Sequence, residues 1–134
     1  MSIMDIIYPS VEKIIEYNVL ALKLIKVKRA DQPKVLNHQM IVDTIEETKK
    51  TEGDIYDKSV VLLKCIIQKH PFASGNRRTA FIVTKDFLLS NQKVFNIEDD
   101  PIQARAMQGI RENYYTTQEI KEWIKHGKIR EFKR

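Results

Sequence analysis

The eleven residues from His70 to Ala80, HPFASGNRRTA, contain the side chains of this chain that could do chemistry. A histidine, with an ordinary pKa of about 6.5, can accept a proton near neutral pH. Gly75 permits the backbone conformation and the close approach that a turn around a ligand needs. Arg77 and Arg78 add guanidinium forks that match the oxygens of a phosphate. The stretch therefore predicts a proton acceptor beside an anion site.

Two apolar helical runs flank this stretch, and they must position it. Residues 59–69 and 81–89 are apolar around most of the helix circumference, which is typical of helices in the middle of a core. A helix that begins at Asn76 leaves the first main-chain N–H groups unpaired, and its dipole favours an anion there. We therefore expect a buried helical hairpin that holds a phosphate site at its turn.

Helix start and stop signals predict four further helices around this hairpin. The sequence shows no internal repeat and no interdomain linker. Ser10 is expected to cap a helix that runs to about Lys26, and Asn37 one that runs to about Lys50. Asp57 is the expected cap of the first core helix. Asp100 with Pro101 should begin the fifth helix, and Thr116 with Glu119 the last helix, which should end at Gly127. Ile102, Ala106 and Ile110 are expected to form the inner face of the fifth helix. The second core helix is expected to run to about Asn91.

The composition predicts one domain over residues 1–134, with 1–5 and 128–134 as flexible tails. A hydrophobic content of 43% with only four glycines and four prolines favours an all-α fold. Cys65 has no second cysteine to pair with and is expected in the core. The sequence has no run of about 20 apolar residues and no signal-peptide pattern, so we expect a cytoplasmic protein without a membrane partner.

The net charge of +5 is concentrated near the C-terminus. Six basic and two acidic residues lie between Lys121 and Arg134. A basic segment of this kind can contact nucleic acid or an acidic partner, but it is more often simply solvated. We do not expect a nucleic-acid partner.

The central stretch resembles the motif of the Fic/Doc (Fido) family, written HPFx[DE]GNGRxxR in Fic proteins and close to HxFx[D]xNKR in Doc-type toxins. The matching positions are His70, Phe72, Gly75, Asn76 and Arg78. A looser resemblance extends from about Ile6 to His126. Arg77 stands where Fic proteins have glycine and Doc-type proteins lysine, and Phe81 stands where the Fic pattern has its last arginine. Both differences favour the Doc-like (death-on-curing) branch.

The resemblance implies a compact bundle of about six helices with a small β-hairpin flap near Val27–Leu36, whose two arms would be Val27–Arg29 and Lys34–Leu36. In that family the histidine, here His70, is the general base for a serine, threonine or tyrosine hydroxyl of a target protein, and Phe72 is structural. The resemblance implies that the nucleotide phosphates are held by the helix-start amides and by Ser74, Gly75, Asn76, Arg77 and Arg78. Arg78 would also neutralise charge on the transferred group. ATP or another NTP is the implied co-substrate. The transferred group is either phosphoryl, as in Doc, or AMP, as in most Fic proteins.

Ser74 departs from the family pattern, which has Asp or Glu at this position to hold Mg²⁺. A hydroxyl is a weak replacement because Mg²⁺ in proteins usually relies on one or two carboxylates with phosphates and water. We therefore expect nucleotide binding with a weakened Mg²⁺ site and slow transfer. The alternative is an inactive family member that binds a nucleotide or a partner protein in the same cleft. Resemblance to small Doc-like toxins also implies an antitoxin as a candidate partner.

Overall fold

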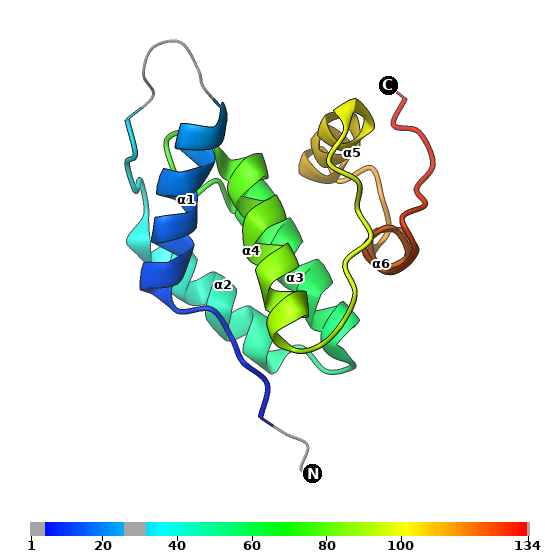
Figure 1. Cartoon of the computed structure of the whole chain (residues 1–134), viewed down its shortest axis with the longest axis horizontal. Coiled ribbons are helices and arrows are strands. Elements are labelled where there is room, and N and C mark those ends of the chain that lie inside the picture. The colour runs from blue at the N-terminus through cyan, green and yellow to red at the C-terminus, as the bar shows by residue number, and fades with distance from the viewer. Residues whose placement is uncertain (1–4, 26–31, 134) are drawn as a thin grey trace.

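The computed structural model describes residues 5–25 and 32–133 of the 134-residue chain, and these residues form six helices (Figure 1). The helices are α1 (Val11–Ile25), α2 (His38–Lys50), α3 (Ile55–Lys69), α4 (Asn76–Ser90), α5 (Pro101–Arg111) and α6 (Thr117–His126). The described residues contain no strand. The predicted all-α class and the six-helix bundle are confirmed.

Helices α3 and α4 form the predicted hairpin at the centre of the bundle. On one side α1 packs against α4 and α2 packs against α3, while α5 and α6 pack against α3 on the other side (Figure 1). This arrangement follows from the sequence, because α3 is apolar on nearly every face and needs neighbours all around it. The turn between α3 and α4 is thereby fixed at one end of the bundle.

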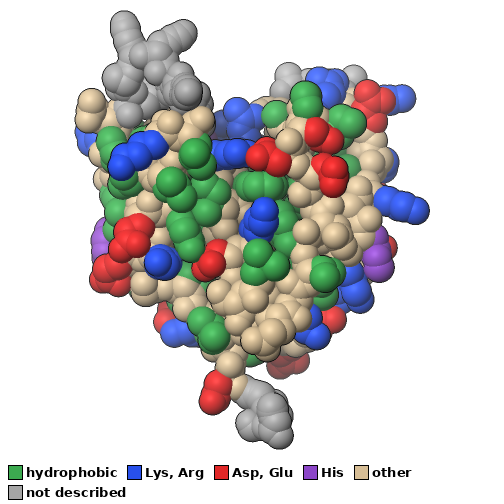
Figure 2. Space-filling model, in the orientation of Figure 1, with side chains coloured by type: hydrophobic (Ala, Val, Ile, Leu, Met, Phe, Trp, Pro, Cys, Tyr) green, Lys and Arg blue, Asp and Glu red, His purple; other side chains and the backbone are tan. Residues whose placement is uncertain are grey.

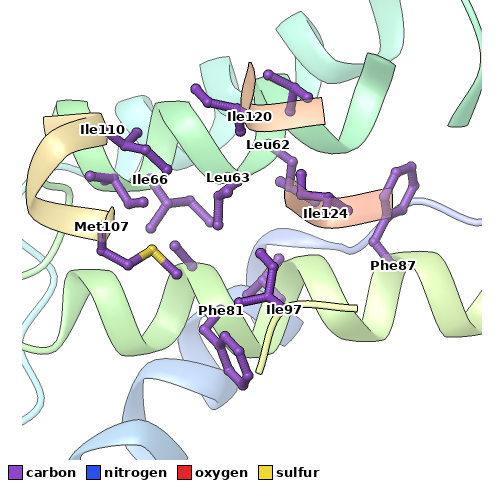
Figure 3. Packing of buried hydrophobic residues seen from close by; sticks show 14 of the residues in the cluster. Leu62, Leu63, Ile66, Phe81, Phe87, Ile97, Met107, Ile110, Ile120 and Ile124 are labelled. Atoms are coloured by element: carbon purple, nitrogen blue, oxygen red, sulfur yellow. The ribbon is translucent and has the colours of Figure 1, made fainter. Parts of the chain in front are cut away.

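One part of the core lies where α5 and α6 meet the central hairpin (Figure 3). Side chains that are at most 1% exposed include Leu62, Leu63, Ile66, Met107, Ile110, Ile120 and Ile124. Burial of one such side chain contributes about 1.5–3 kcal/mol, so this cluster stabilises the packing of α5 and α6 against the hairpin.

The helix caps follow the sequence signals with one exception. Ser10, Asn37, Asp100 and Thr116 cap their helices as predicted. The prediction for α3 was wrong: Asp54 is the N-cap, and Asp57 is the third helical residue. The two aspartates form a capping box in which each side chain accepts the other's main-chain N–H. Either aspartate alone could have capped a helix, so the sequence left the choice ambiguous.

The predicted inner face of α5 is also wrong in one residue. Ala106 and Ile110 are buried, but Ile102 is 69% exposed. Gln103 takes the inward position instead, because residues 103, 106, 107 and 110 share one face of a helix with 3.6 residues per turn.

The C-terminal residues up to 133 lie against the body of the protein. Phe132 is buried, and the Tyr115 hydroxyl donates a hydrogen bond to the Arg130 carbonyl over 2.9 Å. The Arg130 guanidinium also pairs with Glu119. Residues 128–133 therefore do not extend away from the bundle as the expected tail, and part of their positive charge is neutralised locally.

The β-hairpin flap is not seen among the described residues. Its expected first arm, Val27–Arg29, lies outside them. Of the expected second arm, Lys34–Leu36, the middle residue Val35 forms a single antiparallel bridge with Phe72 of the motif. The main-chain N–H of Leu36 donates to the Pro71 carbonyl over 2.8 Å. The motif loop thus supplies main-chain partners to the described arm of the expected flap.

None of the described helices combines the length and the apolar content that a membrane span needs.

Candidate active site

A cleft of about 750 Å³ lies at the turn between α3 and α4. Its walls come from α1, from the turn, from the loop before α5 and from α5 itself. The lining residues include His70, Ser74, Gly75, Asn76, Arg77 and Arg78, together with Asp99, Asp100 and Arg111. Figure 2 shows the hollowed surface between the two sides of the bundle, with basic and acidic side chains close together there. The structure therefore brings all six of the predicted polar-site residues to one cavity.

His70 ends helix α3 in a left-handed conformation, with φ 55° and ψ 57°. A non-glycine residue pays about 1–2 kcal/mol for this conformation. A hydrogen bond from the main-chain N–H of His70 to the Ile66 carbonyl, over 3.3 Å, stabilises this conformation. A strained residue at the edge of a cleft is typical of a functional position, and here the strain turns the chain out of the core and into the cleft.

The surroundings of His70 favour its neutral form. Partial burial lowers its pKa below the ordinary value, and the positive charges of Arg111 and Arg77 lower it further, while the Ile67 carbonyl acts in the opposite direction. The Nδ1 atom is buried and makes no hydrogen bond of normal geometry with a described residue. His70 is therefore neutral at neutral pH, which is the state that can accept a proton.

Phe72 and Asn76 hold the motif loop together. The Phe72 N–H donates to Asn76 Oδ1 over 3.0 Å, and Asn76 Nδ2 donates back to the Phe72 carbonyl over 2.8 Å. Both residues are buried. The side chain of Asn76 is thus committed to the shape of the loop. A phosphate contact from this residue has to come from its main-chain N–H.

The N-terminus of α4 opens into the cleft. Its N-cap is Gly75, with φ 77° and ψ 17°, and no side chain caps the helix. The main-chain N–H groups of Asn76, Arg77 and Arg78 make no hydrogen bond to another described residue. A Cβ at Gly75 would lie 3.1 Å from Leu22 Cδ2, so the turn is closely packed as well as left-handed. These unpaired donors and the helix dipole form the predicted anion site.

Asn18 of α1 supports this turn, and sequence reasoning missed it. Its Nδ2 donates to the Ser74 carbonyl over 2.9 Å and to Thr79 Oγ1 over 3.1 Å, and the residue is 2% exposed. A signal was present, because Asn18 shares one helix face with the apolar residues Ile14 and Leu22. An amide at a core position requires hydrogen-bond partners.

The two motif arginines bind residues near and on α5. Arg78 forms a bidentate pair with Asp99, with nitrogen–oxygen distances of 2.7 and 2.9 Å. This pairing lowers the pKa of Asp99. Arg77 donates to the neutral side chain of Gln108 over 3.0 Å. In this state Asp99 occupies the guanidinium fork of Arg78 as a phosphate would.

Arg111 is a second residue that sequence reasoning missed. It is the last residue of α5, it lines the cleft, and its positive charge acts on His70. Its guanidinium makes no hydrogen bond or ion pair with any described residue. No local sequence signal marked it, because only the packing of α5 brings it to the motif.

The described residues of the cleft do not fit a Mg²⁺ site. Ser74 offers a hydroxyl in place of the expected acid. The carboxylates among the described lining residues are Asp99 and Asp100. Asp99 is held by Arg78, and Asp100 accepts the N–H groups of Ile102 and Gln103 as the cap of α5. The described part of the chain contains no group of three or more His, Cys, Asp or Glu side chains placed to hold a metal ion.

The family of the chain follows from comparison with known families. A model of the Fic/DOC family matches residues 20–88, just over half of the 134 residues, and the match contains the whole motif and most of the central hairpin. The chain belongs to the Fic/DOC family. The match does not separate the Doc-like branch from the rest of the family, so that assignment stays a prediction. A comparison with curated proteins gave no match.

Proposed function

We propose that the protein is a transferase that moves a phosphoryl or nucleotidyl group from ATP, or another NTP, to a hydroxyl group of a target protein. The proposal is supported by one juxtaposition: the neutral His70 and the uncapped N-terminus of α4 line the same cleft. A proton acceptor and an anion site are the two parts that this reaction requires. The volume of about 750 Å³ lies in the usual range of small-molecule sites.

In the proposed reaction His70 accepts the proton of a serine, threonine or tyrosine hydroxyl, and the hydroxyl oxygen attacks phosphorus. Attack at the γ phosphorus forms a new P–O bond and releases ADP. Attack at the α phosphorus transfers AMP and releases pyrophosphate. In either case the α4 amides, Arg77 and Arg78 stabilise the negative charge of the phosphates. Arg77 and Phe81, which differ from the Fic pattern, favour the phosphoryl reaction.

Isotope transfer tests the proposal and separates the two reactions. The protein is incubated with cell lysate and with ATP labelled in either the α or the γ phosphate. Label from the α position on a protein identifies AMP transfer, and label from the γ position alone identifies phosphorylation. A His70→Ala variant should abolish labelling, whereas His38→Ala, which alters an exposed histidine at the start of α2, should not. Equal labelling by His70→Ala and wild type would remove His70 from the role of base.

A second candidate is a family member that binds nucleotide, or a partner protein, without transfer. The specific observation is that Ser74 replaces the metal-binding acid while Asp99 occupies Arg78. Binding of ADP with no transfer of either label, across target-containing lysates, would favour this candidate.

The proposed biological setting is that of a cytoplasmic toxin controlled by an antitoxin that covers the cleft. This setting is supported by family membership and by the Doc-like features of the motif. Expression in a bacterial host should arrest growth, and the His70→Ala variant should relieve the arrest. Normal growth with soluble wild-type protein at a matched level would contradict the toxin role but not the enzymatic one.

A further inference from the structure

The cleft contains more uncompensated positive charge than the motif alone suggested. Of its three described arginines, Arg78 is neutralised by Asp99, Arg77 has a neutral partner, and Arg111 has no partner among the residues that the structure describes. Two guanidinium groups together carry the same charge as one divalent cation. We infer that a nucleotide polyphosphate binds in this cleft without a divalent cation. Arg77 and Arg111 neutralise the phosphate charge that such a cation would otherwise neutralise. The inference rests on the proposed function, because it concerns the same nucleotide site.

The two arginines are placed to act on one ligand. Both line the cleft, and the positive charge of each acts on His70. Arg77 is the second residue of α4, beside the unpaired helix-start amides. It is bonded to Gln108, which lies one turn before Arg111 on α5. Helix α5 therefore carries one guanidinium and steadies the other.

Arginine is well suited to neutralise the phosphates in this cleft. Guanidinium stays charged under all ordinary conditions and binds phosphate oxygens in a bidentate manner. Arg111 has no carboxylate partner among the described residues, so a phosphate would meet an unpaired charge. Arg111 lies in the last turn of α5, where the helix dipole favours a positive charge.

Among the described residues of the cleft, the carboxylates that could bind a divalent cation already have other partners. Asp99 would have to leave Arg78 to bind a cation, and Asp100 would have to give up the cap of α5. Ser74 contributes a neutral oxygen at the position where the family pattern has a carboxylate. Release of Asp99 by an incoming phosphate is a route by which the described part of the cleft could still acquire a metal ligand, so the experiment has to test that route.

Calorimetric titration of wild-type protein with ADP, in EDTA and then in excess Mg²⁺, tests the inference without relying on activity. We expect the two dissociation constants to agree within about threefold. In EDTA, Arg111→Gln and Arg77→Gln should each weaken binding about tenfold, the usual effect of losing one charge-assisted hydrogen bond. Arg105→Gln is the matched control, because Arg105 lies on the same helix but over the Phe132 ring, outside the cleft lining. It should change affinity less than twofold.

Other outcomes separate the failure of this inference from the failure of the proposed function. If Mg²⁺ tightens ADP binding more than about tenfold, the inference is overturned while the nucleotide site stands. If Asp99→Asn then removes that gain, the metal ligand is Asp99. If affinity does not fall in Arg111→Gln, the assignment of Arg111 is wrong. If ADP binds in neither buffer, the nucleotide site and the proposed function fail together.

Discussion

Asn18 of α1 holds Ser74 of the motif through a hydrogen bond of 2.9 Å from Nδ2 to the Ser74 carbonyl oxygen. The same amide group donates to Thr79 Oγ1 in the first turns of α4. The turn that presents the anion site is therefore fastened from outside the hairpin, by a helix far away in the sequence. This contact makes α1 a part of the site rather than only a part of the core.

An Asn18→Ala substitution should lower both stability and nucleotide affinity. Loss of the buried amide leaves the Ser74 carbonyl without this donor, which costs about 1–3 kcal/mol of unfolding free energy. ADP binding should weaken several-fold because the turn loses a fixed orientation. Denaturant unfolding and calorimetry measure the two effects.

The control is Asn91→Ala. Asn91 bonds the Ile7 and Phe87 carbonyls with its own amide, at the opposite end of α4 from the turn. This variant should lose stability while its ADP affinity stays within about twofold of wild type. If the two variants weaken ADP binding equally, Asn18 has only a structural role.

A Gly75→Ala substitution should impair the anion site. The left-handed conformation costs a non-glycine residue about 1–2 kcal/mol, and the new Cβ would press on Leu22. Gly127→Ala is the comparison, because Gly127 has the same φ of 77° but its Cβ would meet the Asn96 carbonyl oxygen at 2.8 Å. Gly127→Ala should cost at least as much stability by denaturant unfolding and leave ADP affinity unchanged. A normal ADP affinity in Gly75→Ala would contradict the role of the turn.

The lowered pKa of His70 predicts two pH dependences. As a base, His70 acts when neutral, so the transfer rate should rise with pH below neutrality and level off near pH 7. Because the unfolded chain binds this proton more tightly than the folded chain, stability should also rise with pH up to the ordinary value of about 6.5 and fall as the medium becomes more acid. NMR titration of the histidine ring signals, with His70→Ala for assignment, measures the pKa. A pKa above 6.5 would contradict the stability dependence and would move the plateau of the transfer rate to higher pH.

Substitution of Asp99 should release Arg78 for the ligand. Asp99→Asn removes the charge that competes with phosphate for the guanidinium fork, so ADP in EDTA should bind about three- to tenfold more tightly. The ion pair is partly exposed, so the loss of stability should stay below about 1 kcal/mol. Glu119→Gln, which breaks the Arg130 pair outside the cleft, is the control and should not change ADP affinity. Unchanged or weaker binding by Asp99→Asn would show that Arg78 does not reach the phosphates.

The central hairpin was predictable because its signals are local. Apolar runs, the glycine turn and the caps depend on residues close together in the sequence, and nearly all of them lie as expected. Arg111 was not predictable, since it reaches the motif only through the packing of α5. For Asn18 the sequence marked an amide on an apolar helix face, but the partners of that amide depend on how α1 packs against the turn. Val35 was expected in one arm of a hairpin flap, and among the described residues it pairs with Phe72 of the motif loop, a contact that no local signal predicted.

Substitution of Ser74 tests whether the phosphate charge in this cleft is neutralised by arginines or by Mg²⁺. Ser74→Asp restores the acid of the family pattern at the rim of the anion site, where a carboxylate, the phosphates and water could together hold Mg²⁺. We expect ADP binding in EDTA to weaken in this variant, because a negative charge is added, and to recover in Mg²⁺. We expect transfer, if measurable in wild type, to rise on the order of 10²-fold with Mg²⁺, since metal stabilisation of several kcal/mol is regained. Ser74→Asn, which is similar in size but neutral, should show neither effect. If the wild type already transfers rapidly and Ser74→Asp changes nothing, the charge of the transferred group is stabilised without this position, and the arginines alone suffice.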